Sequence, residues 1–191
     1  MIFEGVITTT NEDGSAHVTP MGFVREIGTV TVAPFVPSTT LDNLRRHCAA
    51  VMSLMDDVRI IAGCLTSRRD WPVVRAVHVD GWRLADCLAH LEMEVVEQTE
   101  DSERPEFRCR VVAEETHRAF RGFNRAQAAV IEASILVSRL DWLPPEKVAV
   151  EMAYLTLAVE KTAGERERLA WKWLVDAIAR HPRHRIKTET Q

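Results

Sequence analysis

The chain has 191 residues, of which 46% are hydrophobic and 27% charged, and its formal net charge is −4. This composition is typical of a globular protein with one large domain, or one domain with an appendage. An acidic chain without a basic stripe does not suit a nucleic-acid-binding protein. No stretch approaches the roughly 20 apolar residues that span a bilayer, and the start lacks a secretory signal pattern, so we expect a cytoplasmic protein that binds no membrane.

Four cysteines are spaced singly along the chain in apolar surroundings: Cys48, Cys64, Cys87 and Cys109. They form no C-x-x-C pair, and the pattern is typical of buried thiols in a reducing compartment rather than of a disulfide framework or a zinc site. We therefore expect four buried thiols and no metal.

The first part of the chain predicts three antiparallel strands. The segment Phe3–Thr9 is rich in β-branched residues and ends in a polar turn over 11–15, after which Ala16–Phe23 returns. Alternating Thr and Val in Thr29–Ala33 predict the third strand. Because Pro20 cannot donate a ladder hydrogen bond, we expect the second strand to lie at a sheet edge or to contain a bulge, with backbone groups free for a ligand.

The hydroxyl run Ser38-Thr39-Thr40 follows two prolines and precedes a predicted helix over 41–48. Its hydroxyls and the N–H groups of the first helical turn suit a phosphate, because the helix macrodipole favours an anion at that end. The alternative is plain N-capping, for which Ser and Thr are preferred in any helix. The run by itself leaves both interpretations open.

The middle of the chain predicts further strands around one ambiguous segment. The apolar runs Ala49–Met55 and Val73–Val79 each predict a strand. Periodicity does not distinguish helix from strand over Val58–Leu65, where we expect a helix. Leu91–Glu97 and Phe107–Val112 alternate apolar and charged residues, so they predict a long hairpin with one solvated face.

That solvated face carries charges of both signs. Glu92, Glu94 and Glu97 lie on the first strand of the hairpin, and Arg108 and Arg110 lie on the second. We expect these side chains to pair across the strands in contact with water.

From Asn124 onward the apolar spacing is helical. Apolar residues recur every three or four positions from Ala126 to Leu140, from Val148 to Val159 and from Ala170 to Ile178. Asn124 suits the N-cap of the first helix. The elements together predict an α+β protein, an antiparallel β-barrel of about six strands followed by a helical C-terminal appendage. The predicted domains are a barrel over 1–121, a helical subdomain over 122–181 and a flexible tail over 182–191.

Ligand-competent residues concentrate in two neighbouring stretches. They are His17, Thr19, Pro20, Met21 and Gly22 on the second strand, and Ser38, Thr39, Thr40 and Asn43 at the start of the helix. A strand edge can bind the polar edge of a planar heterocycle while a helix N-terminus receives its phosphate, which suits a mononucleotide flavin better than a dinucleotide. Neither G-x-G-x-x-G nor G-x-x-x-x-G-K-[ST] occurs. The alternative is an edge strand and a helix cap with no ligand.

Several blocks resemble a known protein family. They are Thr8–Gly14, Thr19–Gly22, Pro34-Phe35, Ser38-Thr39-Thr40 with Asn43-Leu44, Asp56-Asp57, and Phe123–Ala126 with Val130–Ala133. Together they look like the conserved blocks of an uncharacterised family with the FMN-binding split-barrel fold of the flavin reductase type, and they cover most of the chain. Some members of that family occur among proteins of methanopterin-dependent one-carbon metabolism.

The resemblance implies a homodimer that binds FMN noncovalently at or near the subunit interface. The residues that it places near the flavin ring are Thr9, His17, Thr19, Pro20, Met21 and Gly22, with Phe35 in the same site. Those that it places near the ribityl chain and the phosphate are Ser38, Thr39, Thr40 and Asn43.

The chain departs from the family pattern at the phosphate. Many split barrels carry a basic residue beside the phosphate-binding turn, whereas Val36-Pro37 supplies none here. Either Arg45 or Arg46 turns inward, or backbone N–H groups suffice.

The expected function is that of an FMN-dependent oxidoreductase, which moves electrons or a hydride between a reduced nucleotide or deazaflavin and a small organic, pterin-type acceptor. The alternative is a non-catalytic protein that binds flavin or a pterin-type cofactor. Because the flavin would carry the chemistry, we name no catalytic residue. His78, His90 and His117 accompany no Ser or Cys with a recognisable nucleophile signature, and we expect His181 and His184 to be solvated.

Overall fold

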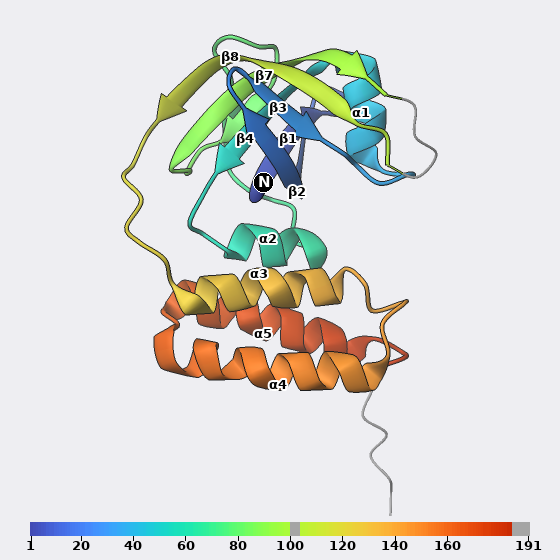
Figure 1. Ribbon diagram of the computed structural model, residues 1–191, viewed down its shortest axis with the longest axis vertical. Helices are drawn as coiled ribbons and strands as arrows, with labels where there is room; N and C mark the ends of the chain where they lie inside the picture. Colours follow the sequence, from blue (N-terminus) through green and yellow to red (C-terminus); the bar gives the residue numbers. More distant parts are fainter. Residues whose placement is uncertain (100–103, 185–191) are drawn as a thin grey trace, which may run out of the picture. The chain divides into compact units, whose positions relative to one another are not determined.

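The computed structural model describes residues 1–99 and 104–184. The chain divides into two compact units, one made of Met1–Asp56 and Asp70–Phe120, the other of Asp57–Arg69 and the chain from Arg121 onward. The first unit holds the strands and the second holds helices (Figure 1). The domain limits 1–121, 122–181 and 182–191 stay a prediction. Contacts within the chain group an early segment, Asp57–Arg69, with the late helices.

Six antiparallel strands close the first unit into a barrel, in the order β1-β2-β3-β8-β7-β4. Their bounds are Ile2–Thr10 (β1), Ala16–Glu26 (β2), Thr29–Val32 (β3), Ala49–Leu54 (β4), Ala89–Gln98 (β7) and Phe107–Thr116 (β8). The prediction of an antiparallel barrel of about six strands is confirmed. Closure requires β3 to pair with β8 and β1 to pair with β4, and both pairings join strands far apart in the sequence.

Apolar side chains from alternate strand positions fill the barrel interior. Its most deeply buried large members include Ile7, Met52, Leu91, Met93 and Phe107. Helix α1 (Thr39–His47) adds Leu41 and Leu44 to the same cluster, so its apolar face packs against the barrel (Figure 1). Each such side chain contributes about 1.5–3 kcal/mol relative to exposure, which holds α1 in place.

Strand β2 has different neighbours along its length. It pairs with β1 from Ala16 to Val24 in an unbroken register. On its other side, β3 pairs with Phe23–Glu26. Within the described residues, Ala16–Gly22 therefore has a strand on one side only, and Pro20 lies at an edge, as predicted, with no bulge.

The predicted strand over Val73–Val79 is too long. Only β5 (Val73–Arg75) is a strand, and it pairs with β6 (Trp82–Leu84) in a separate two-stranded sheet. The N–H groups of the next residues, 77–79, donate to the carboxylate of Glu92 instead of to a neighbouring strand. A local β pattern cannot reveal that a side chain will take these donors.

The charged face of the β7–β8 hairpin matches the prediction in part. Arg110 donates to Glu94 at 2.6 Å, and Arg108 lies 3.6 Å from Glu97. The expectation for Glu92 was wrong, because its side chain is buried at 1% exposure. Segment 77–79 covers this carboxylate and satisfies it with backbone N–H groups, which makes its burial tolerable.

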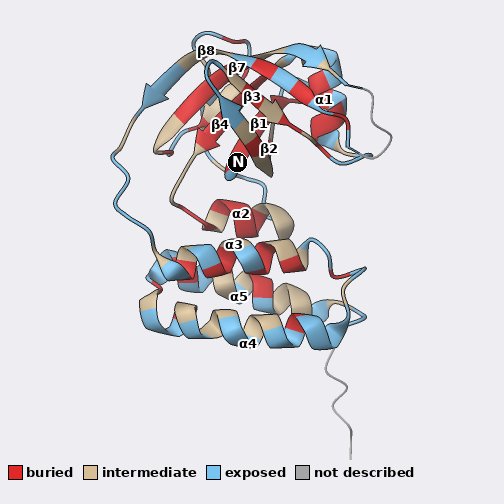
Figure 2. Cartoon of the chain, viewed as in Figure 1, coloured by how far each residue is buried: buried red, intermediate tan, exposed pale blue. Residues whose placement is uncertain are grey.

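The second unit consists of α2 (Arg59–Leu65), α3 (Arg125–Val137), α4 (Pro145–Thr162) and α5 (Glu165–Arg180). The helix expected over Val58–Leu65 is confirmed, and Asn124 caps α3 by accepting the N–H groups of Ala126 and Gln127. The shared core is built largely of small residues: Val58, Ala62, Val130, Ala133, Ala170 and Leu174. Along α4 only Val148 and Val159 are fully buried, which leaves much of that helix exposed (Figure 2). None of the described helices combines the length and apolarity that crossing a membrane requires.

The expectation of four buried cysteines was wrong for two of them. Cys87 and Cys109 are buried, Cys64 is half-buried and Cys48 is exposed. Cys48 is the C-cap of α1, with φ of 53° in the left-handed region. Its apolar sequence neighbours belong to the following strand, so they gave no information about the exposure of the cap.

The expectation that His181 and His184 are solvated was also wrong. Nε2 of His184 donates to the carbonyl of Leu140 at 2.8 Å, and the residue is 8% exposed. Nε2 of His181 lies 3.2 Å from a carboxylate oxygen of Asp141. Residues 185–191 of the predicted flexible tail lie outside the described residues.

Candidate functional site

A buried polar network ties helix α1 to strand β1. Nδ2 of Asn43 donates to Oγ1 of Thr9 and to Oδ1 of Asn11, each at 3.0 Å. Arg46 donates to Oδ1 of Asn43 at 2.9 Å and to the carbonyl of Thr10. Asn43 and Thr9 are 2% and 1% exposed, so these bonds replace water for groups that cannot reach it. The structure brings the predicted residues Thr9 and Asn43 together, but their polar atoms already bond to each other.

The N-terminus of α1 combines a cap with groups that suit an anion. Ser38 is the N-cap, and its Oγ accepts the N–H of Leu41 at 3.2 Å, so the capping interpretation is confirmed for Ser38. The N–H groups of Thr39 and Thr40 belong to the first turn, where a helix offers no acceptor of its own. The Thr39 side chain is exposed and that of Thr40 is buried. Asp42 also lies in this turn, where its carboxylate competes with any other anion for the positive helix end.

The predicted residues of β2 divide between the two faces of the strand. Met21 packs against the barrel core. Because side chains alternate along a strand, His17 and Thr19 share the face of Met21, whereas Pro20 and Gly22 lie on the opposite face. A ligand bound to one face of β2 contacts the side chains of that face. It can reach only the backbone groups of the residues whose side chains lie on the opposite face.

The face of β2 that carries His17 and Thr19 continues onto β1. The register pairs His17 with Thr9 and Thr19 with Ile7, and directly paired residues share a face of the sheet. Side chains of Thr9, His17, Thr19 and Met21 therefore lie on the face of the sheet that lines the barrel interior, since Ile7 and Met21 pack in its core. The edge of β2 from Thr19 to Gly22, which pairs with β1 but with no described strand on its other side, borders this face.

A basic residue that the sequence analysis did not consider lies beside the segment before α1. Arg104 donates to the carbonyl of Ala33 at 3.0 Å, and its guanidinium carbon lies 4.4 Å from the centroid of the Phe35 ring. Phe35 is 60% exposed, so this pair forms at the surface. Arg45 and Arg46 are in the last turn of α1, at the opposite end from the hydroxyl run. No local pattern could identify Arg104, because it lies 71 positions from Ala33.

Two further hydroxyls of β1 are buried without a partner. Thr8 and Thr10 are 1% and 9% exposed, and among the described residues Oγ1 of each has no hydrogen-bond partner. Both lie on the opposite face of β1 from Thr9. A buried polar atom without a partner costs about 1–3 kcal/mol, so these two hydroxyls lower the stability of the barrel unless a further group bonds to them.

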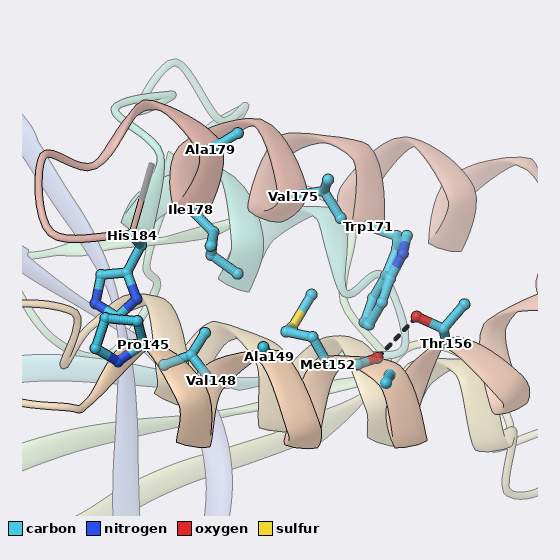
Figure 3. A pocket seen from close by; sticks show the side chains of 11 residues that line it. Pro145, Val148, Ala149, Met152, Thr156, Trp171, Val175, Ile178, Ala179 and His184 are labelled. Atoms are coloured by element: carbon cyan, nitrogen blue, oxygen red, sulfur yellow. Dashed lines mark hydrogen bonds between the residues drawn. The ribbon is translucent and has the colours of Figure 1, made fainter. Parts of the chain in front are cut away.

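The helical unit contains an apolar cavity of about 600 Å³ between α4 and α5. Its larger lining side chains are Val148, Met152, Trp171, Val175 and Ile178 (Figure 3). Two of its polar groups bond within the chain, since Thr156 donates to the carbonyl of Met152 at 2.7 Å and His184 donates to the carbonyl of Leu140. This lining suits an apolar group better than a phosphate, which requires several N–H or O–H donors.

A closed six-stranded antiparallel barrel with an edge strand beside a helix N-terminus is the arrangement of the flavin-reductase type of split barrel. Family models match nearly the whole chain. One, described as the N-terminal domain of a protein of unknown function (DUF447), matches residues 3–118, and its companion, described as a protein of unknown function (DUF447), matches 124–176. The chain therefore belongs to the DUF447 family, which confirms the resemblance in its sequence blocks.

Several solved structures share this fold. An FMN-bound protein of the DUF447 family from Methanosarcina mazei is 18% identical, with a TM-score of 0.80 over 92% of this chain and 94% of that chain. A flavoredoxin from Methanosarcina acetivorans is 16% identical, with a TM-score of 0.54 over 61% and 69%. A 2-nitrobenzoate 2-nitroreductase from Pseudomonas fluorescens is 16% identical, with a TM-score of 0.51 over 60% and 64%. The TM-scores show a common fold, and at identities of 16–18% the likeness shows the fold alone. No curated protein matches the chain.

Proposed function

We propose that the protein binds FMN and acts as an oxidoreductase, moving electrons or a hydride between a reduced nucleotide or deazaflavin and a small organic acceptor of pterin type. The observation that carries this proposal is the open edge of β2 beside the N-terminus of α1, in a fold that matches an FMN-bound structure over almost its whole length. The edge suits the polar side of a planar ring, and the helix start suits a phosphate.

The donor set on this side of the barrel fits FMN. The first-turn N–H groups of α1, the hydroxyls of Thr39 and Thr40, and the guanidinium group of Arg104 would hold the phosphate. The open edge of β2 would hold the ring, with His17 and Thr19 beside it. Arg104 supplies the basic residue that Val36-Pro37 does not.

When bound, FMN supplies hydride and single-electron transfer, so the protein contributes binding, orientation and exclusion of water. The rigid barrel and the Asn43–Thr9 contact set the position of the helix start relative to β1. This preorganisation lowers the entropy cost of binding, because the donors need not be ordered when the ligand arrives.

A second candidate function is a non-catalytic carrier of flavin or of a pterin-type cofactor. It is favoured by the internal use of polar groups: Asn43 donates to Thr9 and accepts from Arg46, which leaves fewer side-chain donors for a substrate. The carrier would use the same open edge and the same helix start, without electron transfer to a second molecule.

The absorption spectrum of the purified protein tests the cofactor, and anaerobic addition of NADH, NADPH or a reduced deazaflavin tests the activity. We expect yellow protein whose visible flavin bands are bleached by at least one donor. Yellow protein that no donor bleaches would support the carrier. Colourless protein that takes up no added FMN would contradict both functions.

We also propose a homodimer whose interface lies near the flavin site. The open edge of β2 supports it, and so do large apolar side chains exposed on the barrel unit: Ile2, Phe3, Ile27, Phe35 and Val36. Light scattering after size-exclusion chromatography is expected to give twice the mass of one chain. A single-chain mass at concentrations where FMN binds would overturn the dimer while leaving the cofactor assignment open to its own test.

A further inference from the structure

Three potential metal ligands converge on the barrel unit, away from the candidate flavin site. Sγ of Cys87 and one ring nitrogen each of His90 and His117 all lie within 4.8 Å of one another. Cys87 and His90 are each 2% exposed, whereas the side chain of His117 is 21% exposed. Cys87 and His90 are thus buried, and His117 is the member of the cluster that is partly exposed.

The backbone of the barrel holds His117 beside Cys87 and His90, although His117 lies 27 positions after His90. Cys87 precedes β7, His90 lies on β7, and His117 directly follows β8. The N–H of His117 donates to the carbonyl of Leu88 at 2.7 Å, and the N–H of Leu88 donates to the carbonyl of Leu54 at 2.8 Å. Groups placed on paired strands keep a more precise geometry than groups on free loops.

Each histidine has a carboxylate at the ring nitrogen that points away from the cluster. Nε2 of His90 lies 3.3 Å from Oε1 of Glu92, within hydrogen-bond distance, whereas Nδ1 of His117 lies 3.7 Å from Oε1 of Glu115, which is too far for a direct hydrogen bond. Three backbone N–H groups also hold the Glu92 carboxylate. A carboxylate at Nε2 favours the tautomer in which that nitrogen carries the proton, so Nδ1 of His90 presents its lone pair to the cluster. Metal-binding histidines use this carboxylate–histidine arrangement.

A hydrogen bond between the two imidazoles is the simpler interpretation. Nδ1 of His90 and Nε2 of His117 are 2.8 Å apart, and their rings are nearly parallel, at 4°, with centroids 5.0 Å apart, so the two rings face each other end to end. That bond accounts for the distance between the two nitrogens, but not for the thiol beside them or for a carboxylate behind each ring. When two histidine ligands hold no metal, a proton shared between their facing nitrogen atoms is also expected. The hydrogen bond is therefore compatible with a metal site.

We propose that Cys87, His90 and His117 bind one zinc ion through Sγ, Nδ1 and Nε2, with a fourth position open to water. A thiolate with two imidazoles is a donor set that suits Zn²⁺, whereas Ca²⁺ and Mg²⁺ require oxygen ligands. Tetrahedral zinc places nitrogen ligands about 3.3 Å apart and sulfur about 3.6 Å from each nitrogen, so the ligand atoms would move by roughly 1 Å. The two rings, which face each other end to end, would also turn so that both lone pairs point at the ion. Three protein ligands with an open position are typical of zinc that activates water or binds a substrate.

Zinc content measured after dialysis of the full-length protein against Zn²⁺ tests the site. We expect one zinc per chain, and a loss of affinity of at least tenfold in Cys87→Ser and in His117→Asn. The matched control is Cys48→Ser, which removes an exposed thiol and is expected to bind zinc like the wild type. Circular dichroism checks that each variant folds, and His117→Asn keeps the test valid if the buried position 87 does not tolerate serine.

Cobalt gives a second readout that does not depend on zinc content. Co²⁺ bound by a thiolate and two imidazoles in a tetrahedral site gives absorption bands in the red, where oxidised flavin does not absorb. We expect these bands in the wild type and in Cys48→Ser, and their loss in Cys87→Ser. Zinc binding well below one per chain, or equal binding by the wild type and both ligand variants, would overturn the proposal. Neither result bears on FMN, since the two sites share no residue.

Discussion

The side-chain amide of Asn43 on α1 donates to the hydroxyl of Thr9 on β1 at 3.0 Å, and both residues are buried. This bond joins the two elements that carry the candidate flavin site. It positions the start of α1 relative to the β1–β2 hairpin, and each polar atom of the Asn43 side chain already has a partner within the chain. The pair therefore acts on the site by positioning it.

Replacing Asn43 with Ala should lower the free energy of unfolding by about 2–3 kcal/mol, because the hydroxyl of Thr9 and the guanidinium group of Arg46 lose a buried partner. Thr9→Val should cost less, about 1 kcal/mol, since it removes one acceptor. Urea denaturation of both single variants and the double variant measures their coupling. Strictly additive losses would show that the bond contributes nothing to stability.

Replacing Thr39 and Thr40 with Val should weaken FMN binding by about 1–3 kcal/mol without unfolding the protein, because hydrogen bonds to a charged phosphate are lost. Single variants separate the exposed Thr39 from the buried Thr40. Ser38→Ala is the control: it should lower helix stability by about 1 kcal/mol through the lost cap. Quenching of flavin fluorescence measures affinity, and unchanged affinity in the double variant would remove the phosphate from this helix end.

Charge changes around the same helix end should act in opposite directions. Arg104→Ala should weaken FMN binding and Asp42→Asn should strengthen it, each by about 0.5–1 kcal/mol, because one removes a cation and the other removes an anion near the phosphate. Both effects should shrink at high salt, where screening shortens the reach of surface charges. A change of the same sign in both variants would rule out an electrostatic role at this position.

The carboxylate of Asp57 should make stability in the helical unit depend on acidity. It is 7% exposed and accepts from Arg59 at 2.9 Å and 2.5 Å, with Arg166 at 3.6 Å. Burial acts to raise its pKa, but the bonds and charge of Arg59, aided by Arg166, outweigh burial and lower the pKa below 3.8. A folded-state pKa below the unfolded one stabilises the protein above pH 3.8, and this contribution is lost as the pH falls through the lowered value.

Asp57→Asn should therefore cost about 1–3 kcal/mol of unfolding free energy near neutral pH, and the cost should vanish in strong acid. Denaturation of wild type and variant across this range measures the difference. A cost that stays the same in acid would assign the effect to packing. Asp176→Asn is a useful comparison, because its exposed pairing with Lys172 should contribute little.

Several features of the site followed from local sequence, and others did not. Ser38 was predictable as a cap, because N-capping depends on residues within one helical turn. Pro20 was predictable as an edge residue, since a missing N–H excludes it from a central strand. The position of Arg104 beside Phe35 was not predictable, because the β7–β8 hairpin brings it there. The burial of Glu92 was not predictable either. Alternation along β7 indicates a solvated face, and it does not reveal that segment 77–79 covers this side chain.

By itself, the sequence determined the hairpins, the helix caps and the barrel class, because turn residues, capping residues and apolar periodicity act over a few neighbouring positions. The family followed from the resemblance of its sequence blocks. Only the tertiary structure decided which polar groups meet. Asn43 reaches Thr9 across 34 positions, and His117 reaches His90 across 27. The packing of α1 on β1 makes the first contact and the register of the β7–β8 hairpin makes the second, and both join residues that no short stretch of sequence places together.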